Sequence, residues 1–325
     1  MKKILVIGGA GYVGSHLTPM LLNEGYEVTV YDLFMYGETI KKHDKLKMVK
    51  GDIRDIERLK KNLSGHDILI HLACISNDPS FDLDPELGKK INFDVFEPLV
   101  KLSIDNGINH FIYASSSSVY GIKEEKDTNE EASLKPLTDY SKFKAMCEEI
   151  LIKYNNENFT TTSIRPATVC GYSTRQRFDL VVNILSNHAF NNKKIIVLGG
   201  EQLRPNIHID DMCRAYLEVI KSQKSKVSNQ IFNVGFENKS VNDLAQIVKE
   251  VMGNDVEVET QSSNDNRSYH ITSEKIKKVL NFKTNKTIKN AVEDLHAAFN
   301  KNLFNDPLNN EMYFNIKRMK SINLK

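Results

Sequence analysis

The sequence predicts an α/β fold with a doubly wound parallel sheet and a smaller C-terminal α/β lobe. Short apolar runs that end at glycines or polar residues alternate with longer stretches of helical periodicity, beginning with the run at residues 4–7. This alternation is typical of strand–helix–strand units with parallel strands. After about residue 172 the alternation weakens, which indicates a second lobe. A chain of 325 residues is long enough for two lobes.

The composition excludes several classes of protein. The net charge is only +2, so we expect no nucleic-acid partner. No apolar stretch approaches the length that spans a membrane, and the apolar run after Lys2 and Lys3 ends at glycines, unlike a signal peptide. The four cysteines lack metal-ligand spacing, so we predict no metal site and reduced thiols in a cytoplasmic protein.

A glycine-rich turn follows the first predicted strand and opens a helix. Two spacings fit the turn: Gly9-x-Gly11-x-x-Gly14 and Gly8-x-x-Gly11-x-x-Gly14. In such a loop one glycine makes the tight turn, one lets the backbone approach a pyrophosphate, and one lets the helix pack against the strand. The helix N-terminus then offers unpaired N–H groups to the phosphates.

The second predicted strand, residues 27–31, ends at Asp32, roughly 20 residues beyond the glycines. A carboxylate at this place bonds the hydroxyls of the adenosine ribose and would repel a 2′-phosphate. The first 32 residues therefore predict a dinucleotide site that takes NAD rather than NADP.

Four more strands of the sheet are predicted at residues 47–50, 67–73, 110–114 and 160–164, with helices at 91–105 and 140–154 and a loop at 74–87. After the third strand, Asp52 and Ile53 could hold the adenine edge, or Asp52 could cap the helix that follows. Asn92 could be a satisfied core amide or could position the site. The sequence leaves both questions open.

The second half of the chain predicts helices at residues 175–190, 242–252 and 291–300 and a short strand at 194–198. A strand at 230–235 is expected to return to the first lobe. We therefore assign residues 1–171 and about 206–236 to the NAD-binding lobe. Residues from about 172 to 205 and 237–325 are assigned to the other lobe.

Catalytic chemistry is predicted where the fifth strand ends and the next long helix begins. Tyr140 and Lys144 are four residues apart, so they share one helix face, and four serines from Ser115 onward follow the strand. A tyrosine with a pKa near 10 is a poor base at neutral pH, and a neighbouring ammonium together with the positive nicotinamide is expected to lower that pKa. Proton removal by tyrosine with hydride loss to NAD⁺ is the oxidation of an alcohol.

These motifs together resemble the extended short-chain dehydrogenase/reductase family, which includes nucleotide-sugar epimerases and dehydratases. The likeness is carried by Gly8-x-x-Gly11-x-x-Gly14, Asp32, Asp52-Ile53, His71-Leu72-Ala73, Asn92, the serine run ending in Val119-Tyr120-Gly121, Tyr140-x-x-x-Lys144 and Arg165-Pro166. The resemblance implies a Rossmann-type lobe, a smaller lobe that binds a nucleoside-diphosphate sugar, and a homodimer formed through the helices near residues 92–105 and 140–154.

The resemblance also implies roles for individual residues. Tyr140 would be the catalytic base, Lys144 its partner and Ser116 the catalytic hydroxyl. The implied NAD-binding residues are Gly8, Gly11, Tyr12, Val13, Gly14, Asp32, Asp52, Ile53, Leu72, Ala73, Asn92, Ser115, Tyr140 and Lys144. The implied substrate-binding residues are Ser116, Ser117, Asn183, Arg204 and Arg267, the arginines for the diphosphate of the sugar nucleotide.

Two departures from the family pattern narrow the reaction. Dehydratases of the family usually carry an acidic residue directly after the catalytic hydroxyl, where this chain has Ser117 and Ser118. The stretch from Arg165 to Arg177 resembles a branch that includes a GDP-heptose C4 dehydrogenase. We therefore expect a nucleotide-sugar 4-epimerase that acts through a transient 4-keto sugar. The alternatives are a C4 dehydrogenase or ketoreductase and, less favoured, a 4,6-dehydratase or a non-catalytic NAD-binding protein.

Overall fold

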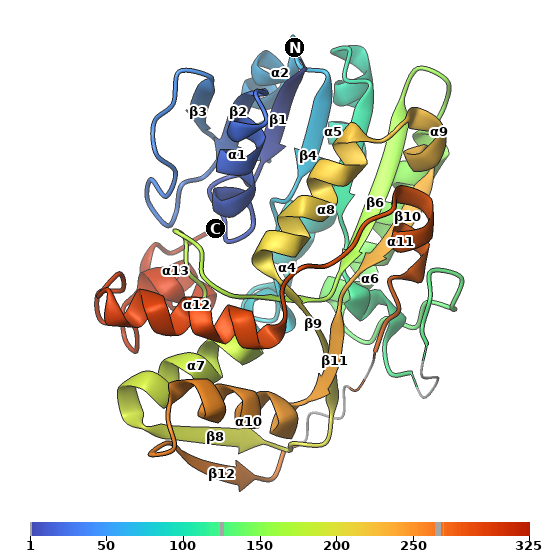
Figure 1. Ribbon diagram of the computed structural model, residues 1–325. Helices are drawn as coiled ribbons and strands as arrows, with labels where there is room; N and C mark the ends of the chain where they lie inside the picture. The colour runs from blue at the N-terminus through green and yellow to red at the C-terminus, as the bar shows by residue number, and fades with distance from the viewer. Residues whose placement is uncertain (1, 124–126, 264–267, 269) are drawn as a thin grey trace.

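The computed structural model describes residues 2–123, 127–263, 268 and 270–325, and it divides into a larger and a smaller lobe (Figure 1). The larger lobe is built on a sheet of seven parallel strands in the order β10-β6-β5-β4-β1-β2-β3. The strands are β1 (Lys3–Ile7), β2 (Glu27–Asp32), β3 (Leu46–Lys50), β4 (Ile68–His71), β5 (His110–Ala114), β6 (Thr160–Pro166) and β10 (Gln230–Val234). This is the predicted doubly wound Rossmann-type fold.

Helices cover both faces of this sheet because alternate strand residues point to opposite sides. Ile4 and Val6 of β1 belong to one buried core, whereas Leu5 and Ile7 belong to the other. The first core packs under α1 (Gly14–Asn23), α8 (Ile209–Lys221) and α11 (Glu274–Leu280); the second packs under α2 (Ile56–Leu63), α5 (Phe96–Asp105) and α6 (Asp139–Tyr154). A short α9 (Lys224–Val227) contacts β6.

The smaller lobe combines two small sheets with three mutually packed helices (Figure 1). One sheet has the order β11-β9-β7 and the other pairs β12 with β8. Its elements are β7 (Thr168–Cys170), α7 (Val181–Asn192), β8 (Lys194–Leu198), β9 (Leu203–His208), β11 (Glu237–Ser240), α10 (Val241–Met252), β12 (Glu257–Gln261) and α12 (Ile288–Asn300). The strand predicted at 230–235 joins the large sheet as β10, as expected.

Three segments differ from the sequence-based expectation. The helix expected from residue 175 begins only at Val181, because Ser173 and the backbone of Arg175 are held by Tyr12 and Ser15 of the first lobe in a non-helical conformation. The loop expected at 74–87 contains α3 (Asp78–Phe81) and α4 (Pro85–Lys89), each capped by the residue before it. The helix expected at 91–105 starts as a π-helical turn at Lys90–Asp94 before α5.

Two 3₁₀ turns lie at Ser117–Tyr120 and Glu311–Tyr313.

The residue bounds predicted for the two lobes remain a proposal. Two segments that the prediction assigned to the smaller lobe pack on the larger one. Ile276 and Leu280 of α11 belong to the core under α1. Met319 of α13 (Asn315–Ser321) belongs to the core of the opposite face. The C-terminus thus comes to lie between the two lobes (Figure 1).

Candidate active site

A cleft of about 530 Å³ runs along the carboxyl ends of the parallel strands and is lined by both lobes. Strand order reverses direction between β1 and β4, and this is where a doubly wound sheet binds its ligand. The predicted site residues that line the cleft are Gly8, Gly11, Tyr12, Val13, Gly14, Asp32, Asp52, Ile53, Leu72, Ala73, Ser115, Ser116, Ser117, Tyr140, Lys144 and Arg204.

The glycine loop has no room for side chains. Gly8 has a φ of +83°, and a Cβ there would lie 2.4 Å from the backbone nitrogen of Ala73. A Cβ on Gly14 would lie 2.5 Å from the Cα of Gly9. Gly8 therefore makes the tight turn and Gly14 allows the close packing of α1, as the Gly8-x-x-Gly11-x-x-Gly14 spacing predicts.

Asp32 ends β2 and holds the loops on both sides of it. Its carboxylate accepts hydrogen bonds from the backbone nitrogens of Ala10, at 3.0 Å, and Phe34, at 2.7 Å. Burial raises the pKa of the Asp32 carboxyl, although both bonds oppose the shift. Each oxygen keeps a lone pair, so the group suits two ribose hydroxyls.

Asp52 lines the cleft but does not cap α2, because that cap is Asp55. The Asp52 carboxylate instead accepts two-pronged hydrogen bonds from the guanidinium of Arg54, at 2.6 and 3.0 Å. The interpretation of Asp52 as the helix cap was wrong. Its place in the cleft leaves the adenine edge as the proposed role.

The catalytic residues predicted from the sequence lie together. Tyr140 is the second residue of α6, whose first turn is held by a capping box from Thr138, and Lys144 follows one turn later. The Lys144 Nζ donates to the carbonyl oxygen of Ala114 at 2.6 Å and lies 5.8 Å from the centre of the Tyr140 ring. Ser116 caps the turn after β5 and bonds the Ser118 hydroxyl at 2.8 Å.

The expected lowering of the Tyr140 pKa does not follow from the protein's own groups. Burial raises the pKa of the phenol well above 10, and nearby Cys74 and Asp78 raise it further. The Ser116 hydroxyl and the Arg177 guanidinium act in the opposite direction but do not outweigh burial. The expectation rested on the ammonium together with the positive nicotinamide and stays a prediction; among the protein's own groups, the loss of hydration is the larger effect.

Two predicted site residues lie outside the cleft lining. Asn92 is a satisfied core amide whose oxygen accepts from the backbone nitrogen of Ile75, at 2.8 Å, and whose nitrogen donates to the Ile75 carbonyl, at 2.9 Å. Asn183 is fully buried and bonds Gly171, Arg177 and the hydroxyl of Tyr12.

Asn92 can act on the site only through Ile75, which does line the cleft. Arg267 lies outside the described residues.

The sequence analysis assigned no role to Arg175 and Arg177, which line the cleft. Both side chains come from the loop after β7 and are more than nine-tenths buried, at 3% and 8% exposure. Two arginines within three residues, just beyond the carboxyl end of a strand, are the signal that could have identified them.

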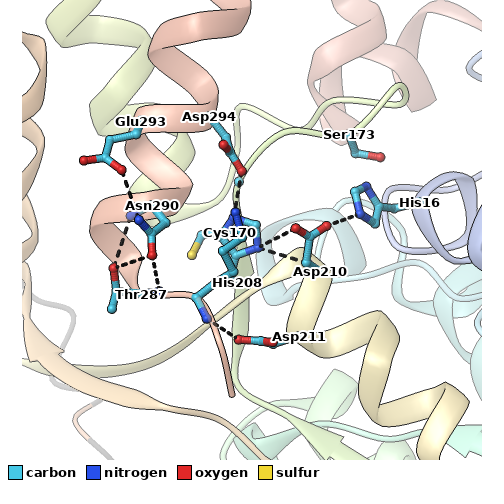
Figure 2. Close-up of polar contacts among 12 residues, drawn as sticks. His16, Cys170, Ser173, His208, Asp210, Asp211, Thr287, Asn290, Glu293 and Asp294 are labelled. Carbon is cyan, nitrogen blue, oxygen red and sulfur yellow. Dashed lines mark hydrogen bonds and ion pairs between the residues drawn. The ribbon is translucent and has the colours of Figure 1, made fainter. Parts of the chain in front are cut away.

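A chain of polar contacts joins the lobes near this loop (Figure 2). His208, the last residue of β9, bonds Asp294 of α12 through Nε2 at 3.0 Å, and its Nδ1 accepts from the backbone nitrogen of Asp210 at 3.0 Å. Asp210 then bonds His16 of α1 at 2.5 Å. The carboxylates lie on different sides of the His208 ring, an arrangement that suits a hydrogen-bonded bridge better than a metal cage.

Comparison with known proteins identifies the fold and the family. The NAD-dependent epimerase/dehydratase family matches residues 4–235. The chain belongs to this family. UDP-glucose 4-epimerase of Lactobacillus helveticus is 27% identical over 78% of this chain and 83% of that protein. A Bacillus cytotoxicus UDP-N-acetyl-alpha-D-glucosaminuronate decarboxylase is 27% identical over 77% and 80%. The UDP-glucose 4-epimerase structure from Thermotoga maritima matches with a TM-score of 0.83 and 26% identity, covering 93% of this chain and all of that one.

The chain is therefore an NAD-dependent sugar-nucleotide enzyme, with a cleft whose lining fits the cofactor. The crowded glycine loop and the Asp32 carboxylate both line the cleft, and they are the features that hold a diphosphate and an adenosine ribose in folds of this kind. None of the described helices is long and apolar enough to cross a membrane.

Proposed function

We propose that this enzyme is a nucleotide-sugar 4-epimerase that works by transient oxidation at C4 of the sugar. The observation that carries the proposal is the arrangement of Ser116, Tyr140 and Lys144 at the end of the cofactor cleft. Similarity to proteins named UDP-glucose 4-epimerase supports it and makes uridine diphosphate sugars the first substrates to try.

The chain's own residues would handle the proton of the sugar hydroxyl. The Tyr140 oxygen would take the proton of the C4 hydroxyl and return it later, while the Ser116 hydroxyl donates a hydrogen bond to the same sugar oxygen. Lys144 is anchored on the Ala114 carbonyl, so its ammonium stays beside the phenol and favours the phenolate. Bound NAD would supply the hydride acceptor for C4 and then the hydride donor for the other face of the sugar.

The serine run argues against a dehydratase. The positions after Ser116 hold Ser117, which is buried, and Ser118, whose hydroxyl is bonded to that of Ser116. Serine hydroxyls are poor general acids for the loss of water, because their pKa lies far above neutral. Oxidation and reduction at C4 remain the chemistry that these groups support.

Product analysis tests the proposal and separates it from the dehydrogenase alternative. The protein would be incubated with UDP-glucose, UDP-galactose and UDP-N-acetylglucosamine, then with GDP- and dTDP-sugars, while NADH absorbance and product mass are followed. A new isomer of unchanged mass without lasting NADH is expected. NADH accumulation with a product lighter by two hydrogens would instead establish a C4 dehydrogenase.

The Tyr140→Phe variant is the control for catalysis. It should lose at least about a hundredfold in turnover, because it lacks the proton acceptor, yet bind NAD as before. Full turnover in this variant would remove Tyr140 from the mechanism.

A further inference from the structure

Residues 173–177, here called the strap, cross the cofactor cleft from the glycine loop to the loop after β4. At one end the Ser173 hydroxyl donates to the carbonyl of Tyr12 at 2.9 Å, and the backbone nitrogen of Arg175 donates to the Ser15 hydroxyl at 3.3 Å. Ser15 is the second residue of α1. The strap therefore lies against the helix N-terminus that receives a diphosphate in this fold.

The other end of the strap is held by the guanidinium of Arg177. Its Nη1 donates to the Ser76 hydroxyl at 3.0 Å, and its Nε donates to the carboxylate of Asp179 at 2.8 Å. Ser76 follows β4, the strand next to β1 in the sheet. Arg175 and Arg177 thus stand along the line on which a doubly wound sheet holds its dinucleotide.

Arg175 faces the adenosine side of this line. Its guanidinium carbon lies 3.6 Å from the centre of the Tyr36 ring, four residues beyond Asp32, and its Nη2 donates to Asn315 at 2.6 Å. The charge of Arg175 is felt by Asp32, whose carboxyl pKa it lowers against the larger effect of burial. These neighbours all belong to the cofactor side of the cleft.

Each of these two guanidinium groups has a buried N–H without a hydrogen-bond partner among the described residues. The atoms are Nε of Arg175 and Nη2 of Arg177. A buried donor without a partner costs about 1–3 kcal/mol, so such atoms indicate a missing acceptor. Across the described ranges Arg177 has an ion pair with Asp179, whereas no ion pair is formed by Arg175. Within the described residues the two guanidinium groups of the strap thus have one ion-paired carboxylate between them, that of Asp179.

We propose that Arg175 and Arg177 bind the diphosphate of NAD and complete the site begun by the glycine loop and the N-terminus of α1. A diphosphate carries two negative charges, and guanidinium groups can bind phosphate oxygens through two N–H bonds. The diphosphate of the sugar-nucleotide substrate is a second anion that guanidinium groups could bind. The residue predicted to bind the substrate's diphosphate is Arg204, however, which lies on β9 of the smaller lobe. The proposed site follows the strap from its contact with Ser15 to its contact with Ser76, so that the strap would lie over the bound cofactor.

Calorimetric titration with a series of ligands tests this assignment without any sugar substrate. Arg175→Gln and Arg177→Gln would be titrated with NAD⁺, ADP and adenosine, beside Arg58→Gln, a control at an exposed position of α2. Each strap variant should bind NAD⁺ and ADP roughly ten- to a hundredfold more weakly, because each loses charge-assisted hydrogen bonds to phosphate. Adenosine, which lacks the diphosphate, should bind with unchanged affinity.

The same titrations can overturn the proposal. Unchanged ADP affinity, or an equal loss for ADP and adenosine, would remove the arginines from the diphosphate site. Unchanged ADP affinity with weakened binding of UDP, titrated in parallel, would assign them to the substrate. If a glutamine variant unfolds, Arg175→Lys and Arg177→Lys decide, because they keep the charge without the two-pronged geometry. A several-fold loss of ADP over adenosine supports the proposal, and no loss contradicts it.

Discussion

At the scale of single residues, Asp32 holds the backbone of the glycine loop and is the residue predicted to bind the adenosine ribose. Its oxygens accept from Ala10 and Phe34, so the carboxylate is held in one orientation. Such preorganisation lowers the entropic cost of binding. We therefore expect Asp32 to act on the cofactor directly and also through the loop that it holds.

Replacing Asp32 tests both functions. Asp32→Ala should weaken NAD⁺ binding by at least about tenfold, because two hydrogen bonds to a charged acceptor are lost. Asp32→Asn keeps acceptors for part of these bonds and should weaken binding less. Titration calorimetry of both variants checks the order. Equal NAD⁺ affinity in Asp32→Ala and the unaltered protein would refute the ribose assignment.

The pKa of Tyr140 is predicted to depend on the cofactor's charge. Burial raises it well above 10, and the nearby groups of the protein do not outweigh that effect. The nicotinamide of NAD⁺ is positive and should lower this pKa, whereas that of NADH is neutral and should not. Activity should therefore rise with pH through the pKa of the NAD⁺ complex.

Phenolate absorbance during pH titration measures this effect. The difference between the unaltered protein and Tyr140→Phe isolates Tyr140 from the other tyrosines. An identical titration midpoint with NAD⁺ and NADH would contradict the electrostatic argument.

At the scale of elements, helix α6 carries the proposed catalytic residues Tyr140 and Lys144 and is joined to the sheet by a buried ion pair. Glu148, one turn after Lys144, accepts from Arg165 of β6 at 2.6 Å, and both side chains are almost fully buried. Arg165 also donates to the Tyr120 hydroxyl at 2.7 Å. This network sets the position of α6 on the strands that end at the active site.

Breaking this ion pair should cost far more than breaking a surface pair on the same helix. Glu148→Ala is expected to lower the free energy of unfolding by about 3–5 kcal/mol, because it leaves Arg165 buried without a counter-ion. Lys142→Ala breaks the exposed pair with Asp139 and should cost below about 1 kcal/mol. Denaturant titration of both variants measures the two losses. Similar losses would mean that the buried pair contributes little.

At the scale of the whole molecule, two buried histidines make the fold sensitive to acid. Burial lowers the pKa of His71 and of His110 to about 3. In the unfolded chain both titrate near 6.5, so between about pH 6.5 and 3 the unfolded state binds protons that the folded state does not. Stability is therefore full above this range and falls as the pH drops through it.

Each histidine should contribute about 1.4 kcal/mol of destabilisation per pH unit within that window. His71 is surrounded by the rings of Phe96, Phe111 and Tyr113, so His71→Phe should retain the packing and remove its share of the slope. Urea titrations at several pH values check this. An unchanged slope in His71→Phe would show that other groups dominate acid unfolding.

The homodimer remains a prediction. The helices expected to form it, α5 and α6, carry exposed apolar side chains, with Ile104 at 36%, Met146 at 40% and Ile152 at 40% exposure. Exposed apolar side chains that group on neighbouring helices are typical of an interface.

Much of the site could be predicted because it is local in sequence. The glycine turn, Asp32, the serine run and the Tyr140–Lys144 pair each lie within one strand end or one helical turn, where spacing alone sets which side chains share a face. Helix caps at Asn77 and Asp84 were also local signals and could have predicted α3 and α4.

What spacing could not determine is the environment of each group. The pKa of Tyr140 depends on burial by segments far away in the chain, and Asn92 reveals its partner, Ile75, only when the loop after β4 is folded. The strap is the clearest case. Its contacts with Ser15, Ser76 and Asn315 join residues that are 160, 101 and 140 positions apart in the sequence, respectively.

The sequence by itself determined the parallel Rossmann-type sheet and the glycine turn after its first strand, and it predicted the three catalytic side chains, because hydrophobic period and local turn chemistry are written along the chain. Only the tertiary structure decided which buried groups lack partners, where Arg175 and Arg177 stand, and that the C-terminal α13 borders the cofactor cleft. These properties depend on the loss of hydration and on contacts between distant residues, and both arise only when distant segments pack together.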